Sequence, residues 1–223
     1  MQIAIDGPAS AGKSTIAKLV AQKLSFIYID TGAMYRSCTL IAKNHGLDYG
    51  DEKDLLPLLT KNSIVFKNNN AGQQVWVEGK DASLEIRTPE ITANVSQVST
   101  LPGVRKKMVA MQREMAKGNV IMDGRDIGTT VLPHADLKIF MIASVATRAK
   151  RRQLDYREKG IEQPLAEIEE DIRVRDYKDS HRQVSPLRKA SDAVELDTSD
   201  MSIAEAVAAI LDLVHKKEKN ITK

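Results

Sequence analysis

One short stretch near the start of the chain most limits what this protein can fold into. It consists of Gly7, Pro8, Ala9, Ser10, Ala11, Gly12, Lys13 and Ser14, followed by Thr15. The first eight residues fit the pattern G-x-x-x-x-G-K-[ST] at every fixed position. The apolar run Ile3–Asp6 predicts a buried strand before it, and Thr15–Leu24 places apolar residues at helical spacing after it. A strand, a glycine-rich loop and a helix form the context that a phosphate-binding P-loop requires.

The residue types in this loop suit the phosphates of a nucleoside triphosphate. Gly7 and Gly12 can adopt backbone angles that other residues avoid, which lets main-chain N–H groups surround a phosphate. The positive end of the following helix adds to the attraction. Lys13 supplies a mobile charge for the β- and γ-phosphates, and the Ser14 hydroxyl is placed to bind Mg²⁺. We therefore expect Gly7–Thr15 to be the nucleotide site.

A second strand and helix follow directly and predict a parallel sheet. Phe26–Asp30 has the apolar character of a buried strand, and a helix is expected from Thr31, as its N-cap, to about Asn44. Alternating strands and helices wind a parallel sheet, and ligands of such sheets lie beyond the carboxyl ends of the strands. We therefore expect Asp30, Thr31 and Arg36 at the same edge as the P-loop.

The segment Val120–Asp123 has the form of a Walker B strand, three apolar residues followed by a carboxylate. Asp123 is a candidate Mg²⁺ ligand, directly or through water. The continuation Gly124–Gly128 brings Arg125 and Asp126 to the same edge. Arg125 suits a bidentate phosphate contact, although a structural pair between arginine and aspartate is the alternative.

The middle of the chain has a different character. Ser63–Lys67 and Gln74–Glu78 alternate apolar and polar residues, as half-exposed antiparallel strands do, and the turn-rich Asn68–Gly72 separates them. A third short strand is expected near Lys80. We interpret this part as a small inserted subdomain that Trp76 helps to pack.

Helices and strands resume after the insert. Helices are expected over about 89–98, 102–117, 146–159, 165–177 and 203–217, and strands at 137–142 and 193–196. Arg148, Arg151 and Arg152 share one helix face. The set Arg175, Asp179 and Arg182 shares another, beyond Gly160. Each set is compatible with solvated salt bridges, but together they predict a hinged lid that closes over phosphates.

Composition excludes several classes of protein. The 33 basic and 30 acidic residues give a net charge of +3, without the concentrated basic character of a protein that binds nucleic-acid polymers. Cys38 is the single cysteine, so no intrachain disulfide forms, and a reducing cytoplasm is expected. No apolar run is long enough to predict a membrane span, and no signal peptide is expected.

The chemistry of the acceptor separates the remaining kinase classes. A hydroxyl acceptor needs a carboxylate base, whereas a phosphate acceptor is already mostly ionised near neutral pH and needs arginines. Arg36, Arg105, Arg125, Arg175 and Arg182 are numerous enough for a phosphate acceptor. A regulatory nucleotide switch is the alternative class, but the chain has no Asn-Lys-x-Asp motif for reading guanine.

Four segments together strongly resemble the bacterial cytidylate kinase family: Gly7–Thr15, Asp30–Arg36, Asp123–Gly128 and Arg175–Arg182. The resemblance covers essentially the whole chain. It implies an α/β P-loop fold with a five-stranded parallel sheet flanked by helices. It also implies a core of residues 1–36, 119–147 and 183–223, a monophosphate-binding region of 37–118 with a subdomain near 62–87, and a lid with flanking helices at 148–182.

The same resemblance implies transfer of the γ-phosphoryl group of ATP, with Mg²⁺, to CMP or dCMP. It assigns catalysis to Lys13, Arg125, Arg148, Arg152 and Arg175, and the metal to Ser14 and Asp123. It lines the monophosphate site with Thr31, Arg36, Ser96, Arg105, Arg125, Asp126, Arg175, Asp179 and Arg182.

Among these residues, Ser96 would help to read cytosine, Asp126 would contact base or sugar, and Asp179 would bind the ribose. Another monophosphate kinase, for UMP or dTMP, is the alternative, and a hydroxyl kinase such as shikimate kinase leaves the insert unexplained. A monomer is expected.

Overall fold

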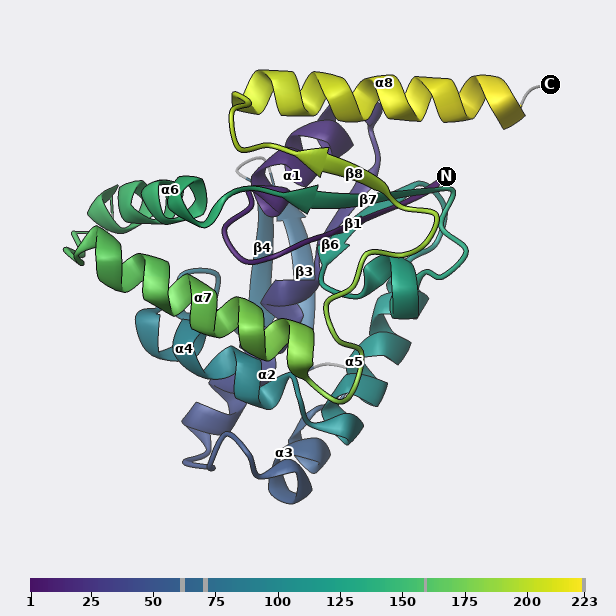
Figure 1. Cartoon of the computed structure of the whole chain (residues 1–223). Helices are drawn as coiled ribbons and strands as arrows, with labels where there is room; N and C mark the ends of the chain where they lie inside the picture. The colour runs from purple at the N-terminus through teal and green to yellow at the C-terminus, as the bar shows by residue number, and fades with distance from the viewer. Residues whose placement is uncertain (61–62, 70–71, 159, 222–223) are drawn as a thin grey trace. The chain divides into compact units, whose positions relative to one another are not determined.

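The chain forms two compact units in the computed structural model, which describes residues 1–60, 63–69, 72–158 and 160–221. The first unit comprises Met1–Ile29 and Ala116–Lys223, and the second comprises Asp30–Met115. Figure 1 shows the course of the chain through the elements of each unit. Among the described residues, no helix has the length and apolar character needed to cross a membrane.

The first unit is built on a five-stranded sheet in the order β2-β6-β1-β7-β8. Its strands are β1 (Gln2–Asp6), β2 (Ile27–Asp30), β6 (Val120–Gly124), β7 (Leu137–Ile142) and β8 (Val194–Asp197). Strand β1 pairs in parallel with β6 and β7, and β7 pairs in parallel with β8. The register sets Asp6 of β1 opposite Gly124 of β6, so the P-loop and the Walker B strand end at the same edge. The predicted α/β fold with a five-stranded parallel sheet is confirmed.

The described residues of the first unit form four α-helices: α1 (Lys13–Leu24), α6 (Val145–Glu158), α7 (Leu165–His181) and α8 (Ile203–Ile221). Apolar residues of α1 and α8 pack with those of β1 and β7 in one buried cluster, which includes Ile5, Val20, Ile139 and Ile210. Helices α1 and α8 lie together against the sheet in Figure 1. Helix α7 runs four residues beyond the predicted end at Tyr177, since no glycine or proline interrupts it before Arg182.

The second unit is a helical cluster with a small antiparallel sheet. Its helices are α2 (Thr31–Asn44), α3 (Glu52–Leu58), α4 (Pro89–Val98) and α5 (Pro102–Met115), with one 3₁₀ turn at Glu85–Arg87. The sheet has the order β3 (Ile64–Asn69), β4 (Gly72–Val77) and β5 (Lys80–Asp81). Within the predicted hairpin loop, Asn70 and Ala71 lie outside the described residues.

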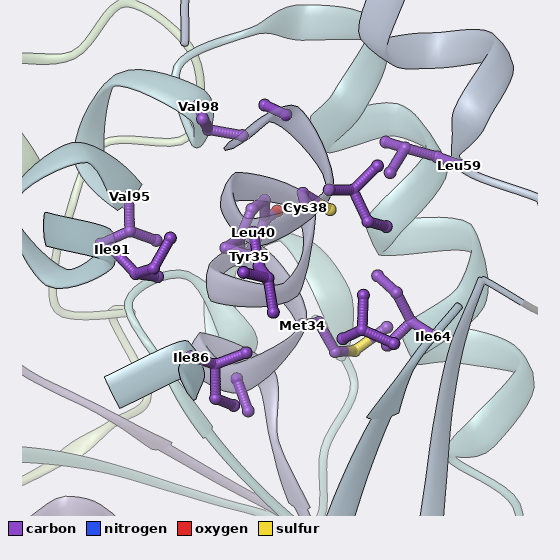
Figure 2. Close-up of a cluster of buried hydrophobic side chains, with 14 of the residues drawn as sticks. Met34, Tyr35, Cys38, Leu40, Leu59, Ile64, Ile86, Ile91, Val95 and Val98 are labelled. Carbon is purple, nitrogen blue, oxygen red and sulfur yellow. The ribbon is translucent and has the colours of Figure 1, made fainter. Parts of the chain in front are cut away.

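The core of the second unit is apolar and well packed. Figure 2 shows Met34, Cys38 and Leu40 of α2 together with side chains of α4 and of the loop and strand near Ile64. Cys38 is fully buried, and burial raises the pKa of its thiol to about 12. Cys38 thus serves as a small apolar residue of the core. Trp76 lies on β4, where the Lys67 ammonium sits 3.5 Å from its ring centroid.

One local prediction is wrong: Thr31 is not the N-cap of α2. Thr31 is the first helical residue, and Asp30 is the cap, because its carboxylate accepts a hydrogen bond from the Ala33 N–H at 2.8 Å. A carboxylate is a charge-assisted acceptor at the positive end of a helix, so it competes better for this position than the neighbouring hydroxyl.

Candidate functional site

The P-loop connects β1 to α1 in a backbone conformation that its glycines permit. Gly7 has a φ of 150°, and a Cβ there would lie 2.0 Å from the Met141 carbonyl oxygen on β7. Gly12 is the left-handed N-cap of α1, with a φ of 88°. A side chain at either position would therefore clash or strain the loop, and the amides at the start of α1 remain directed into it.

Lys13 is buried at the start of α1 and turns back on its own loop. Its ammonium donates to the Pro8 carbonyl oxygen at 2.7 Å. Burial, with the nearby positive charge of Arg125, lowers the pKa of Lys13 well below its usual range. An anionic group in the loop would offset both effects, so the electrostatics of this site favour a phosphate.

Ser14 and Asp123 meet at the predicted metal site, although 109 residues separate them in sequence. The Ser14 hydroxyl donates to Oδ2 of Asp123 at 2.7 Å, and the Tyr28 hydroxyl donates to Oδ1 at 2.8 Å. A hydroxyl and a carboxylate are the hard oxygen donors that Mg²⁺ accepts, usually with phosphates and water completing its shell. Among the described residues, no group of three or more His, Cys, Asp or Glu forms a fuller metal site.

Asp6 holds the segment that follows the Walker B strand. It lies at the carboxyl end of β1 and accepts hydrogen bonds from the amides of Ile127 at 2.8 Å and Gly128 at 2.7 Å. Residues Ile127–Val131 form a single π-helical turn that the sequence did not predict. Burial raises the pKa of the Asp6 carboxyl to about 6. Sequence reasoning missed this residue, although an acid at the end of an apolar strand was a visible signal.

Helix α7 and its C-cap residue Arg182 supply the charged partners of Arg125 and Asp126. Arg125 pairs with Asp179 at 2.9 Å, and Arg182 lies 3.6 Å from Asp126. Burial of Asp179 opposes its ionisation, but Arg125, Arg175 and Arg182 outweigh it and hold the pKa of Asp179 below its usual range. The structure therefore pairs Arg125 and Asp126 with Asp179 and Arg182, while Arg175 acts on Asp179 within its own segment.

The three arginines predicted to share one face of α6 make different contacts. Arg148 is buried, donates to the carbonyl oxygens of Ala143 at 2.9 Å and Ala9 at 3.1 Å, and pairs with Asp176 at 2.7 Å. The next arginine along this face, Arg151, donates to Ala11 O and to Thr198 O. Arg148 and Arg151 thus each hold a carbonyl of the P-loop.

Arg152 makes a local contact instead. Its Nε donates to the Tyr156 hydroxyl at 3.1 Å, one turn further along α6. Sequence reasoning did not assign three contributors to the loop: Arg151 and Thr198, which donate to backbone carbonyls, and Asp176, which pairs with Arg148.

In the second unit, the Asp30 carboxylate forms ion pairs with two arginines. Arg36 lies 3.0 Å and Arg87 lies 3.4 Å from its Oδ2. Burial opposes ionisation of Asp30, yet the two guanidinium groups lower its pKa below the usual value. Two positive charges on one carboxylate leave a net positive charge beside the buried Thr31. Arg87 was not predicted, and half of its side chain is exposed.

Ser96 and Arg105 lie on α4 and α5 of the same unit. Arg105 is buried, donates to the Ser99 carbonyl oxygen at 3.0 Å, and lies over the Tyr35 ring at 5.3 Å. The Ser96 carbonyl accepts from the Ser99 hydroxyl at 2.9 Å. The prediction that Thr31 and Arg36 share an edge with the P-loop joins the two units and stays a prediction.

Comparisons with known proteins agree on one family. Residues 3–216 match the family model described as cytidylate kinase. A cytidylate kinase of Lactobacillus gasseri is 66% identical over 221 residues, which are 99% of this chain and 96% of that protein. A cytidylate kinase of Bacillus cereus is 52% identical over 215 residues, 96% of each chain.

A solved gluconokinase from Sinorhizobium meliloti has the same fold, with a TM-score of 0.51 and 14% identity over 99% of this chain and 95% of that one. The P-loop, the Ser14–Asp123 pair and the match over almost the full length point the same way. This chain belongs to the cytidylate kinase family.

Proposed function

We propose that this protein transfers the γ-phosphoryl group of ATP to CMP or dCMP, giving ADP and CDP or dCDP. The observation that carries the proposal is the P-loop site of Lys13, Ser14 and Asp123 in a chain that is 66% identical to a cytidylate kinase. The charged groups of this site are already gathered at the loop, and such preorganisation is the main source of catalysis in phosphoryl transfer.

The donor half of the reaction falls to the P-loop. Residues Gly7–Thr15 bind the ATP phosphates, and Lys13 exchanges its contact with the Pro8 carbonyl for the β- and γ-phosphates. Ser14 and Asp123 would hold Mg²⁺, since their oxygens already lie within hydrogen-bond distance of each other. When bound, the cation neutralises charge on the phosphate oxygens.

The acceptor half falls to the arginines. The acceptor phosphate is already ionised near neutral pH, so cationic residues rather than a general base are required. Arg36 and Arg87 hold this phosphate from the second unit, with Thr31 beside them, and Arg125 holds it from the first. Asp30 supports this role by holding both guanidinium groups on one carboxylate.

Recognition of the nucleoside is the remaining task of the acceptor residues. Ser96 and Arg105 read cytosine, Asp126 contacts base or sugar, and Asp179 binds the ribose. The pairs Arg125–Asp179 and Arg182–Asp126 support these assignments, because each fixes the orientation of the group that meets the substrate. Arg175 completes the set from α7.

The lid is assigned to residues 148–182, where Arg148 and Arg152 act on the transferred phosphoryl group. Their position on α6 supports this assignment, and Arg148 already reaches the loop at Ala9. Lys159 of this region lies outside the described residues.

A coupled assay of ADP release, with ATP and a panel of CMP, dCMP, UMP and dTMP, tests the proposal. We expect turnover with CMP and dCMP and a much lower kcat/KM with UMP. Equal use of UMP would leave a broader pyrimidine monophosphate kinase. ATP hydrolysis that does not respond to any monophosphate would instead favour a nucleotide switch.

A cytoplasmic enzyme that acts as a monomer completes the proposal. The single cysteine, buried in the core of the second unit, is compatible with a reducing compartment. Size-exclusion chromatography with light scattering measures the oligomeric state.

A further inference from the structure

Asp123 is held from both sides by hydroxyl groups. Ser14 on α1 donates to Oδ2, and Tyr28 on β2 donates to Oδ1. Asp123 itself is only 4% exposed. A buried carboxylate that accepts from a hydroxyl on each oxygen cannot rotate about its terminal bond without breaking these hydrogen bonds, so its orientation is fixed.

Tyr28 is well suited to fix this carboxylate. Strand β2 is the neighbour of β6 in the sheet, and Asp123 lies near the carboxyl end of β6. The Tyr28 ring packs against the apolar core of the first unit, while Ile27, the preceding residue, is 50% exposed. The ring is therefore held by packing, and its hydroxyl reaches the carboxylate without a flexible linker.

The orientation of Asp123 determines what Ser14 offers to a cation. Because the Ser14 proton points to Oδ2, the lone pairs of its oxygen are directed away from Asp123. If Asp123 turned, the Ser14 hydroxyl would lose the acceptor that fixes its proton. Tyr28 thus acts on the oxygen donors through Asp123, without being a ligand itself.

We propose that Tyr28 is a positioning residue for the metal site, which orients Asp123 and, through it, the Ser14 hydroxyl toward the Mg²⁺ of the nucleotide. This inference rests on the proposed function in one respect, the assignment of Mg²⁺ to Ser14 and Asp123. It does not depend on the identity of the acceptor nucleotide.

The test compares ADP binding with and without metal, so no turnover is required. ADP affinity is measured by calorimetry in EDTA and again with Mg²⁺, for the unmodified protein, Tyr28→Phe and Tyr49→Phe. Tyr49 is the matched control, because its hydroxyl also donates to a carboxylate, Glu90, at 2.9 Å in the second unit. Both variants keep the ring and remove one hydroxyl.

We expect Tyr28→Phe to bind metal-free ADP within twofold of the unmodified protein. The gain in affinity on adding Mg²⁺ should fall by about fivefold, the scale of one charge-assisted hydrogen bond felt indirectly. Tyr49→Phe should keep the full gain. In an Asp123→Asn background, Tyr28→Phe should cause almost no further loss, because the group that it positions is already altered.

Equal weakening of metal-free and metal-loaded ADP would make Tyr28 a structural residue and overturn the inference. An unchanged gain in ADP affinity on adding Mg²⁺ would also overturn the inference. If Tyr28→Phe does not fold, 3-fluorotyrosine at position 28 replaces it. Its more acidic hydroxyl should increase the gain in ADP affinity on adding Mg²⁺. If the unmodified protein gains ADP affinity on adding Mg²⁺ and Tyr28→Phe loses that gain, but CMP is not phosphorylated, the proposed substrate is refuted and this inference stands.

Discussion

The two units bury charge in different ways. Among the described residues, the first unit buries seven charged side chains: Asp6, Lys13, Asp123, Asp126, Lys138, Arg148 and Asp179. The second buries two, Asp30 and Arg105. In the first unit the contacts join distant parts of the chain, such as Ser14 with Asp123 over 109 residues and Arg148 with Ala9 over 139. In the second, Asp30 takes partners within 57 residues, around one helix start.

This difference indicates that the two units of a kinase of this family contribute to different steps of the reaction. The first unit fixes a loop of backbone groups, so it needs many side chains that each hold one carbonyl or amide. The second unit has fewer such contacts, and its Arg36 and Arg87 share one carboxylate, so we expect these cations to act together but separately from the loop. Substitutions in the first unit should therefore impair several steps together, whereas those in the second should affect only the acceptor.

The largest effect is expected for Lys13→Ala in the first unit. Removing the charge that follows the γ-phosphate should lower kcat by at least about a thousandfold while the fold is retained. Steady-state kinetics measure kcat, and circular dichroism measures whether the fold is retained. Lys18→Ala, a change at an exposed residue of α1, is the control. Retention of more than about a tenth of the activity, a loss of less than about 1.4 kcal/mol, would remove Gly7–Thr15 as the donor site.

Arg36→Ala tests the independence of the cations in the second unit. We expect kcat/KM for CMP to fall by about a hundredfold, the scale of a charge-assisted phosphate contact, while the KM for ATP changes less than about twofold. Asp30 keeps Arg87 as a partner, so the fold should persist. Lys106→Ala, exposed on α5, is the control. A comparable loss in ATP binding would show that the two halves are coupled.

The Asp126→Asn variant tests whether a residue of the first unit also recognises the base. Cytosine offers an exocyclic amine donor where uracil has a carbonyl, so a carboxylate favours CMP, whereas an amide can face either base. We expect the ratio of kcat/KM for CMP to that for UMP to narrow by about tenfold. An unchanged ratio with lower CMP activity would assign Asp126 to holding Arg182, its partner at 3.6 Å.

The smallest effect is expected from the titration of Asp6. Burial raises the pKa of this carboxyl to about 6, from an ordinary 3.8. A carboxyl whose pKa is raised by folding costs stability when charged, and the cost disappears as the pH falls through the folded pKa toward the unfolded one. Between pH 7 and pH 5, Asp6 should therefore raise the free energy of unfolding by about 1 kcal/mol.

Urea unfolding at the two pH values measures this effect. The free energy of unfolding of the unmodified protein, minus that of Asp6→Asn, should increase by about 1 kcal/mol as the pH falls from 7 to 5. Asp212→Asn, exposed on α8, gives the background. A difference that stays constant, or that falls, would contradict the direction of the shift.

The sequence alone determined the elements whose signals are local. The P-loop could be read because its residues are contiguous, and the sheet could be read because its strands are buried runs of apolar residues. The approximate ends of most helices followed from periodicity and prolines. Even the meeting of Ser14 with Asp123 was predictable, because parallel strands end at one edge of a sheet.

Only the tertiary structure determined which polar groups form hydrogen bonds or ion pairs with one another. Arg125 pairs with Asp179 rather than with its neighbour Asp126, and Arg148 and Arg151 turn to backbone carbonyls of the P-loop. Tyr28 showed no motif, and the position of Asp6 at the end of an apolar strand did not indicate its partners, because these partners lie 95 residues or more away. A hydrogen bond depends on distance and angle between atoms, and folding sets these for residues far apart in the chain, whereas local spacing sets them only within a helix, a strand or a loop.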